Sequence, residues 1–232
     1  MKLSRSQGVS VIVGIVLVCL GIYALYLGAQ SHDPYKGLVT EKLIEIDEPT
    51  REYFEQRLAT TLAAIAATEA ANEDVELNLY LSASSDAYLL GDLVMAREML
   101  EKQLAGNSIN YVAWNNYALV LEDMEDYENA EDAFVKTLEI QSGVQKYYAD
   151  FANFLLAHFP ERREDLKHLY EDDLARRGQT VWNMTGLGDW YAAGGECALA
   201  VDHYEVAVAL DPNTQALKDD FEMLKTSCVA TD

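Results

Sequence analysis

The 232-residue sequence contains little proline and few positive charges. Four prolines and 13 glycines leave few obligatory breaks, so the composition favours long helices over a loop-rich fold. Only 17 lysines and arginines stand against 39 aspartates and glutamates, which gives a net charge of −22. Such a surface repels phosphate backbones, so nucleic acid is excluded as a partner and basic partners or cations are favoured. An acidic helix surface is, however, commonly no more than a solvated one.

Signatures of catalysis and of metal binding are also scarce. The four histidines, His32, His158, His168 and His203, are scattered along the chain, and the HExxH, GxSxG and phosphate-loop patterns do not occur. The acidic stretch from Glu122 to Asp132 lacks the glycine and the ligand spacing of a calcium-binding loop. We therefore expect a protein that is not an enzyme and that needs no cofactor and no metal.

One long apolar segment lies near the N-terminus. Val9 to Leu27 comprises 19 residues without a charge. At about 1.5 Å per residue it spans roughly 28 Å, the thickness of a bilayer's hydrocarbon core. A cleaved signal peptide would have a shorter apolar region and a small residue where Leu27 stands in "LGA". We expect an uncleaved transmembrane helix over residues 9–28.

The flanking charges predict how this helix is oriented. Lys2 and Arg5 precede it, which places residues 1–8 in the cytoplasm and the rest of the chain outside it, as a single-pass protein of the cell membrane. Two lysines that follow the segment weaken this asymmetry. Glycines recur every seven residues and would allow two such helices to approach closely, although glycine is common in spanning helices. Self-association through the membrane helix is therefore possible.

The next two segments differ in pattern. Residues 29–49 mix charge, proline and glycine without a sustained period, which is typical of a linker, and "GLVTEKLIEI" within them fits a short strand or an extended segment. From Thr50, which can cap a helix, the pattern becomes helical and predicts an N-terminal capping helix in the segment 50–76, with the alanine-rich pattern running to Ala71. Its expected apolar stripe consists of Tyr53, Phe54, Leu58, Leu62 and Ile65.

A repeat of 34 residues follows. In the unit 111–144, small residues stand at positions 8 and 20 (Ala118, Ala130) and large ones at 4, 7, 11 and 24 (Trp114, Tyr117, Leu121, Phe134). Comparable residues recur in the units 77–110 and 181–214, and residues 145–180 form a longer, divergent unit with "PERRED" in its turn. Residues 215–232 fit a C-terminal capping helix and tail. Each unit predicts a helical hairpin, and because one hairpin cannot bury its apolar face alone, neighbours must stack.

The pattern "W-x2-Y-A-x2-L…A-x3-F" in the second unit and "L-G-x2-Y…A-x3-Y…A-x4-P" in the fourth resembles the tetratricopeptide repeat (TPR) family, over roughly Leu77 to Thr214. The resemblance implies an all-α fold, in which the transmembrane helix is followed by a right-handed solenoid of helical hairpins and a closing C-terminal helix. It also implies a concave groove, lined by positions 2, 5, 6, 9, 12 and 13 of each first helix, that binds a protein or peptide partner. The candidate groove residues are Asn78, Leu81, Ser85, Tyr88, Asn115, Asn116, Leu119, Glu122, Lys146, Asp150, Asn153, Trp182, Thr185 and Asp189.

The chemistry of these positions narrows the kind of ligand. Paired asparagines such as Asn115 and Asn116 can form hydrogen bonds with a peptide backbone. Some members of the family hold a C-terminal carboxylate between lysine, arginine and asparagine side chains. Leu81, Ser85 and Asp150 stand where three of those residues are required, so we expect no such capture here.

The cysteines suggest one covalent link. Cys197 begins the second helix of the fourth unit, and Cys228 ends the closing helix. Those helices should run antiparallel as neighbours, which brings the two positions to the same end. A disulfide is then feasible in an oxidising compartment if the Cα atoms lie within about 7 Å, and two unrelated thiols are the alternative.

Two functions remain open from the sequence. The first is a membrane-anchored interaction scaffold that binds a peptide segment or assembles an envelope complex on its groove. The second is a structural envelope protein that associates with itself and has no peptide ligand. A groove packed shut by the closing helix would favour the second, and exposed apolar and asparagine side chains in the groove would favour the first.

Overall fold

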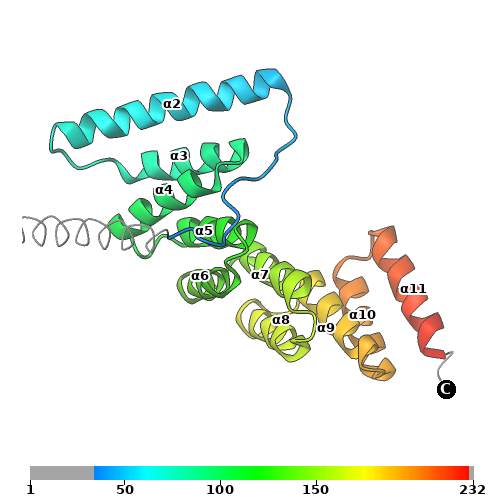
Figure 1. Ribbon diagram of the computed structural model, residues 1–232. Helices are drawn as coiled ribbons and strands as arrows, with labels where there is room; N and C mark the ends of the chain where they lie inside the picture. Colours follow the sequence, from blue (N-terminus) through cyan, green and yellow to red (C-terminus); the bar gives the residue numbers. More distant parts are fainter. Residues whose placement is uncertain (1–33, 230–232) are drawn as a thin grey trace, which may run out of the picture. The chain divides into compact units, whose positions relative to one another are not determined.

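The computed structural model describes residues 34–229, in which ten helices follow one another along the chain (Figure 1). The chain divides into two compact units after Thr40, and all ten helices belong to the second. The expected transmembrane helix at 9–28 lies outside the described residues. Within residues 34–229, no helix combines the length and the apolar character needed to cross a membrane.

Each of the ten helices packs against the helix that precedes or follows it in sequence. A single antiparallel β-bridge, between Glu41 and Asp92, is the β structure of the described residues. The helices are α2 (Glu48–Ala70), α3 (Leu77–Leu90), α4 (Leu93–Gly106), α5 (Tyr111–Asp123), α6 (Tyr127–Ile140), α7 (Gln145–His158), α8 (Arg163–Arg177), α9 (Val181–Ala193), α10 (Cys197–Leu210) and α11 (Gln215–Val229).

Helix α2 begins two residues earlier than the sequence pattern suggested, and its N-terminal cap is a different residue. The carboxylate of Asp47 accepts a hydrogen bond of 2.8 Å from the backbone N–H of Thr50, so Asp47 is the cap and Thr50 is already inside the helix. Pro49 occupies the first turn, where its missing N–H costs nothing. The helix ends at Ala70, within one residue of the end expected from the alanine-rich pattern, and Asn72 takes the left-handed conformation (φ 55°).

Helix α2 is attached to α3 by an apolar contact and by an ion pair. Ile65 packs against Tyr80 in one buried cluster. The guanidinium of Arg57 donates Nε hydrogen bonds of 3.0 and 2.8 Å to both carboxylate oxygens of Asp86, whose side chain is completely buried. Tyr53, predicted to belong to the apolar stripe, is instead 55% exposed, with the Arg57 guanidinium over its ring.

The hairpins begin where the sequence repeat begins, at Leu77, Tyr111, Gln145 and Val181. Small residues let the two helices of a hairpin cross closely; Ala118 and Ala130, at positions 8 and 20 of the second hairpin, are completely buried. Position 8 of the fourth hairpin is Gly188, and a Cβ atom there would lie 2.5 Å from the ring of Tyr204. The glycine therefore accommodates a tyrosine in the space that phenylalanine or leucine fills in the first two hairpins.

The turns inside three hairpins share one backbone conformation at position 15. Gly91, Glu125 and Gly195 all have positive φ, at 87°, 63° and 78°. The third hairpin differs, because its turn spans residues 159–162, and the last three residues of "PERRED" already belong to α8. There the guanidinium of Arg162 forms hydrogen bonds of 2.7 and 2.6 Å with the carboxylate of Glu131, which holds the longer turn against α6.

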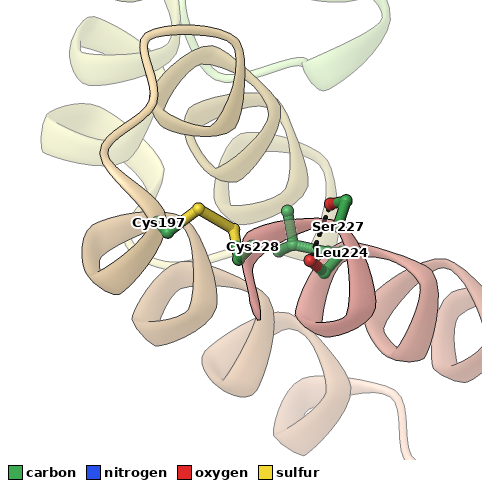
Figure 2. Close-up of a disulfide and its surroundings, with 4 residues drawn as sticks. All are labelled: Cys197, Leu224, Ser227 and Cys228. Atoms are coloured by element: carbon green, nitrogen blue, oxygen red, sulfur yellow. Dashed lines mark hydrogen bonds between the residues drawn. A yellow bond between two sulfur atoms is a disulfide. The ribbon is translucent and has the colours of Figure 1, made fainter. Parts of the chain in front are cut away.

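The C-terminal helix α11 closes the stack by packing on α10. Leu217 and Leu224 are buried there in one cluster with Tyr204. The last turn of α11 is joined covalently to the first turn of α10, because Cys197 and Cys228 form a disulfide (Figure 2). The two Cα atoms are 5.5 Å apart, inside the limit set from the sequence.

Candidate functional site

The face formed by the first helices of the four hairpins, α3, α5, α7 and α9, carries the predicted groove residues, and we call it the groove face. One hollow of this face lies between α3 and α5 and has a volume of about 230 Å³; we call it the α3/α5 pocket. Predicted residues at positions 9 and 12 of one hairpin meet those at positions 6 and 9 of the next. The lining residues are Ser84, Ser85, Tyr88, Leu89, Leu100, Asn116, Leu119 and Val120.

The walls of the α3/α5 pocket are mainly apolar. The hydroxyl groups of Ser84 and Ser85 both donate to the backbone oxygen of Leu81, at 2.8 and 3.0 Å, so they are satisfied within α3. Asn116 contributes an amide with donor and acceptor capacity to the same wall. An aliphatic side chain would therefore be buried in this pocket, beside one amide that can bind a peptide group.

A charged cluster adjoins the pocket at Tyr88. The Tyr88 hydroxyl donates a hydrogen bond of 2.7 Å to Oδ2 of Asp123, at the C-terminal end of α5. The Lys42 ammonium lies 2.7 and 2.8 Å from the two oxygens of that carboxylate and 5.8 Å from the centre of the Tyr88 ring. Burial raises the pKa of Tyr88 well above its usual value of 10, and the carboxylates of Asp123 and Glu122 raise it further. The Tyr88 hydroxyl therefore remains a hydrogen-bond donor at neutral pH.

A second hollow of about 300 Å³, the α7/α9 pocket, lies between α7, α8 and α9. One wall is fixed by Trp190, whose indole N–H donates 2.8 Å to the backbone oxygen of Arg163. In return, the Arg163 guanidinium donates a hydrogen bond of 2.9 Å to the backbone oxygen of Trp190 and lies over the indole ring. The pocket is lined by Leu155, Leu156, Phe159, Pro160, Arg162, Arg163, Leu166, Tyr170, Gly186, Asp189, Trp190 and Ala193.

Several predicted groove residues are engaged within the protein. Asn115 is only 2% exposed, and its side-chain amide donates a hydrogen bond of 2.9 Å to Oδ2 of Asp150. The Asp150 carboxylate also forms an ion pair with Lys146. The expectation that Asn115 and Asn116 act as a pair of surface asparagines is therefore corrected, because Asn115 ties α5 to α7. Trp182 is half-buried, with its ring 4.8 Å from the ring of Tyr170.

The other predicted residues vary in their availability. The Glu122 carboxylate lies 2.8 Å from Nε2 of His158, and the Asp189 carboxylate accepts a hydrogen bond of 2.6 Å from the Tyr204 hydroxyl. Thr185 donates to the backbone of its own helix. Asn78 and Asn153 are exposed and Leu81 is half-buried. The structure brings half-buried Ser85, Tyr88, Asn116 and Leu119 together around the α3/α5 pocket, while exposed Asn78, Lys146 and Asn153 lie outside it.

The sequence pattern missed Lys42 and Asp123 as part of this surface. The two residues are separated by 81 positions, and Lys42 lies in a segment without helical periodicity. Position 13 of the second hairpin, where Asp123 stands, was already among the expected groove positions, so that residue could have been found.

The fold resembles solved helical repeat structures. No family model matches the sequence, and no curated protein matches it. The C-terminal part of a TPR repeat-containing protein from Cytophaga hutchinsonii is 20% identical, with a TM-score of 0.57 over 74% of this chain and 70% of that one. A crystal structure of MamA is 14% identical, with a TM-score of 0.55 over 73% and 97%. A MamA RS-1 double mutant is 16% identical, with a TM-score of 0.52 over 65% and 84%. The described part of the chain therefore has the helical repeat fold seen in a TPR repeat-containing protein.

Proposed function

We propose that this chain is a membrane-anchored protein–protein interaction scaffold that binds an extended peptide segment on its groove face. The observation that carries the proposal is the α3/α5 pocket, an apolar hollow of about 230 Å³ at the junction of two hairpins. A mostly apolar pocket with one or two polar groups is the usual architecture of a binding site. The helical repeat fold supports the proposal, because stacked hairpins present an extended surface to a partner.

The alternative is a structural protein that associates with itself and binds no peptide. A groove closed by the C-terminal helix would favour it. Instead, α11 packs on α10 through Leu217 and Leu224, and the residues lining the α3/α5 pocket come from α3, α4 and α5. We therefore favour peptide binding over self-association.

Peptide binding can be tested with a matched pair of variants. Peptides selected from a displayed library against the wild-type protein would be measured on Leu119→Arg, which fills the α3/α5 pocket, and on Val135→Arg. Val135 is 41% exposed on α6, so its replacement makes the same change in charge and a similar change in size away from the groove face. We expect roughly tenfold weaker binding, or worse, for Leu119→Arg, as for the loss of one central contact, and no change for Val135→Arg. Equal affinity for both variants would count against the groove face as the site.

We also propose that the N-terminus lies in the cytoplasm and the hairpins on the opposite side of the cell membrane. The apolar segment 9–28 and its preceding charges support this orientation. The Cys197–Cys228 disulfide supports it independently, because disulfides persist in oxidising compartments.

Membrane sidedness can be measured with one reporter cysteine. Glu128→Cys places a thiol on an exposed position of α6, in a background where Cys19 is replaced by serine. A membrane-impermeant maleimide should label this thiol in intact cells. Labelling only after lysis would show the reverse topology.

A further inference from the structure

A short stretch of the chain's own N-terminal region is docked beside the α3/α5 pocket. We call residues 41–44 the docked segment. The backbone N–H of Lys42 donates a hydrogen bond of 2.9 Å to the backbone oxygen of Gly91, in the turn between α3 and α4. Glu41 forms the β-bridge with Asp92. The Lys42 side chain then reaches Asp123 on α5. The segment thus connects the first hairpin to the second at the edge of the site.

The docked segment is anchored mainly through Lys42 and Ile44, and the backbone oxygen of half-buried Ile44 accepts a hydrogen bond of 3.2 Å from Arg51. The ion pair that fixes it is partly solvated, with the Lys42 side chain 41% and the Asp123 side chain 20% exposed. Such pairs contribute little to stability because water and salt screen them. Leu43, the next residue, is 89% exposed and adds no packing. The Lys42 side chain is therefore a weakly held part of the segment.

The acceptor for that cation is well formed. Asp123 presents a carboxylate that also accepts the Tyr88 hydroxyl at 2.7 Å, and the ring of Tyr88 faces the ammonium group. Tyr88 is at the same time a wall of the α3/α5 pocket. One residue therefore joins a cation acceptor to an apolar hollow, which suits a ligand that carries a basic side chain close to an aliphatic one.

We infer that the partner is a basic, extended peptide segment whose lysine or arginine replaces Lys42 on Asp123 while an aliphatic side chain enters the α3/α5 pocket. The docked segment occupies the cation acceptor until the partner displaces it. The inference rests on the proposed peptide-binding function and adds the chemistry of the partner. The net charge of −22 agrees with it, because complementary charge steers a basic ligand to this surface.

The turn glycines provide a matched pair of variants. A Cβ atom at Gly91 would lie 2.0 Å from the backbone oxygen of Lys42, so Gly91→Ala excludes the docked segment. Gly195 occupies the same position of the fourth hairpin, with φ of 78° against 87°, and a Cβ atom there would meet nothing within 4 Å. Both replacements carry the same cost for alanine at positive φ, and only the first disturbs the segment. Neither residue belongs to the proposed ligand site.

A second pair removes the cation itself. Lys42→Ala leaves Asp123 and Tyr88 in place and frees the acceptor. Lys136→Ala is the charge-matched control, because Lys136 pairs with Glu139 within α6. Asp123→Asn in the Lys42→Ala background then removes the acceptor from the freed site.

Binding would be measured on the full chain by the fluorescence anisotropy of a labelled peptide with alternating lysine and leucine, and of its counterpart with glutamate for lysine. We expect Lys42→Ala and Gly91→Ala each to bind the lysine peptide about two- to fivefold more tightly than wild type. This follows because the apparent dissociation constant falls as the fraction of open site rises. Gly195→Ala and Lys136→Ala should match wild type. Asp123→Asn added to Lys42→Ala should weaken binding of the lysine peptide by roughly tenfold or more relative to Lys42→Ala alone. The glutamate peptide should bind none of the variants.

The two ways of failing are distinguishable. If peptides selected from the library lose affinity with Leu119→Arg but respond to none of the changes at Lys42, Gly91 and Asp123, peptide binding stands and the basic partner is wrong. If Leu119→Arg changes the affinity of neither the selected peptides nor the lysine peptide, both the proposed peptide-binding function and the basic partner are wrong. Circular dichroism of every variant checks folding, and Lys42→Ala keeps the test decisive if Gly91→Ala does not fold.

Discussion

Removing the Cys197–Cys228 disulfide should release the C-terminal helix before any other part of the described chain. The paired replacement Cys197→Ala and Cys228→Ala opens a loop of sequence separation 31. In the chain-entropy description, closing a loop of about 30 residues constrains the unfolded chain by about 3.7 kcal/mol at 25 °C. This value is an upper bound, because relaxation of the native contacts offsets part of it.

The loss should be local because of how α11 is held. Leu217 and Leu224 are buried there with Tyr204, and Phe221 stacks on the same tyrosine with ring centres 6.1 Å apart. A helix of this length is marginal alone in water. In a stack of hairpins each element depends chiefly on its neighbours, so loosening α11 leaves the distant hairpins intact.

Hydrogen–deuterium exchange with mass spectrometry tests this directly. Peptides from α11 should exchange up to a few hundredfold faster in the double variant, which is the factor that about 3.7 kcal/mol allows. Peptides from α3 to α6 should be unchanged. Reducing agent should reproduce the effect in the wild type and add nothing to the variant. Equal protection of α11 in the oxidised wild type and the double variant would refute the argument.

Three further predictions concern other contacts. Arg57→Ala should lower the free energy of unfolding in urea by about 3 kcal/mol, because the buried carboxylate of Asp86 loses its counterion; a loss below about 1 kcal/mol would contradict that role. Gly188→Ala should lower the melting temperature, because a Cβ atom 2.5 Å from the Tyr204 ring forces repacking that costs about 1–3 kcal/mol; an unchanged or higher melting temperature would count against this. Burial, reinforced by a neighbouring carboxylate, raises the pKa of Tyr117 from 10 to about 12. Its stabilising contribution should be complete below pH 10 and lost as the pH rises through about 12, and an absorbance titration that compares wild type with Tyr117→Phe should place the lost tyrosine there rather than near pH 10.

The repeat made most of the helical architecture predictable. Hairpin starts at Leu77, Tyr111, Gln145 and Val181 follow from small and large residues at fixed positions, because helix crossing imposes that spacing on the sequence. The start of α2 was less predictable, because both Asp47 and Thr50 are residue types that can cap a helix and it is Asp47 that accepts the hydrogen bond. These differences are local, and they leave the order of the hairpins unchanged.

The site was only partly predictable, for a different physical reason. Positions 6, 9 and 12 identify Asn116, Ser85 and Tyr88 because those positions share one helix face. The same rule also selected Asn115, which the next hairpin covers and Asp150 binds. The repeat position of a residue tells which helix face it lies on, but it does not tell whether the next hairpin buries its side chain. Contacts from a non-periodic segment, such as that of Lys42, leave no trace in the repeat.

The docked segment also determines the path of mechanical load through the molecule. It lies between the more N-terminal residues and α2, so tension applied before Lys42 is first carried by the Lys42–Asp123 pair and the Lys42–Gly91 hydrogen bond. While these hold, tension bypasses α2 and passes directly to the first two hairpins. The two contacts close a loop of about 50 residues between Lys42 and Gly91. Once the contacts break, this loop comes under load, beginning with α2 and the ion pair between Arg57 and Asp86. A partner that displaces Lys42 would therefore change which helix bears the first pull.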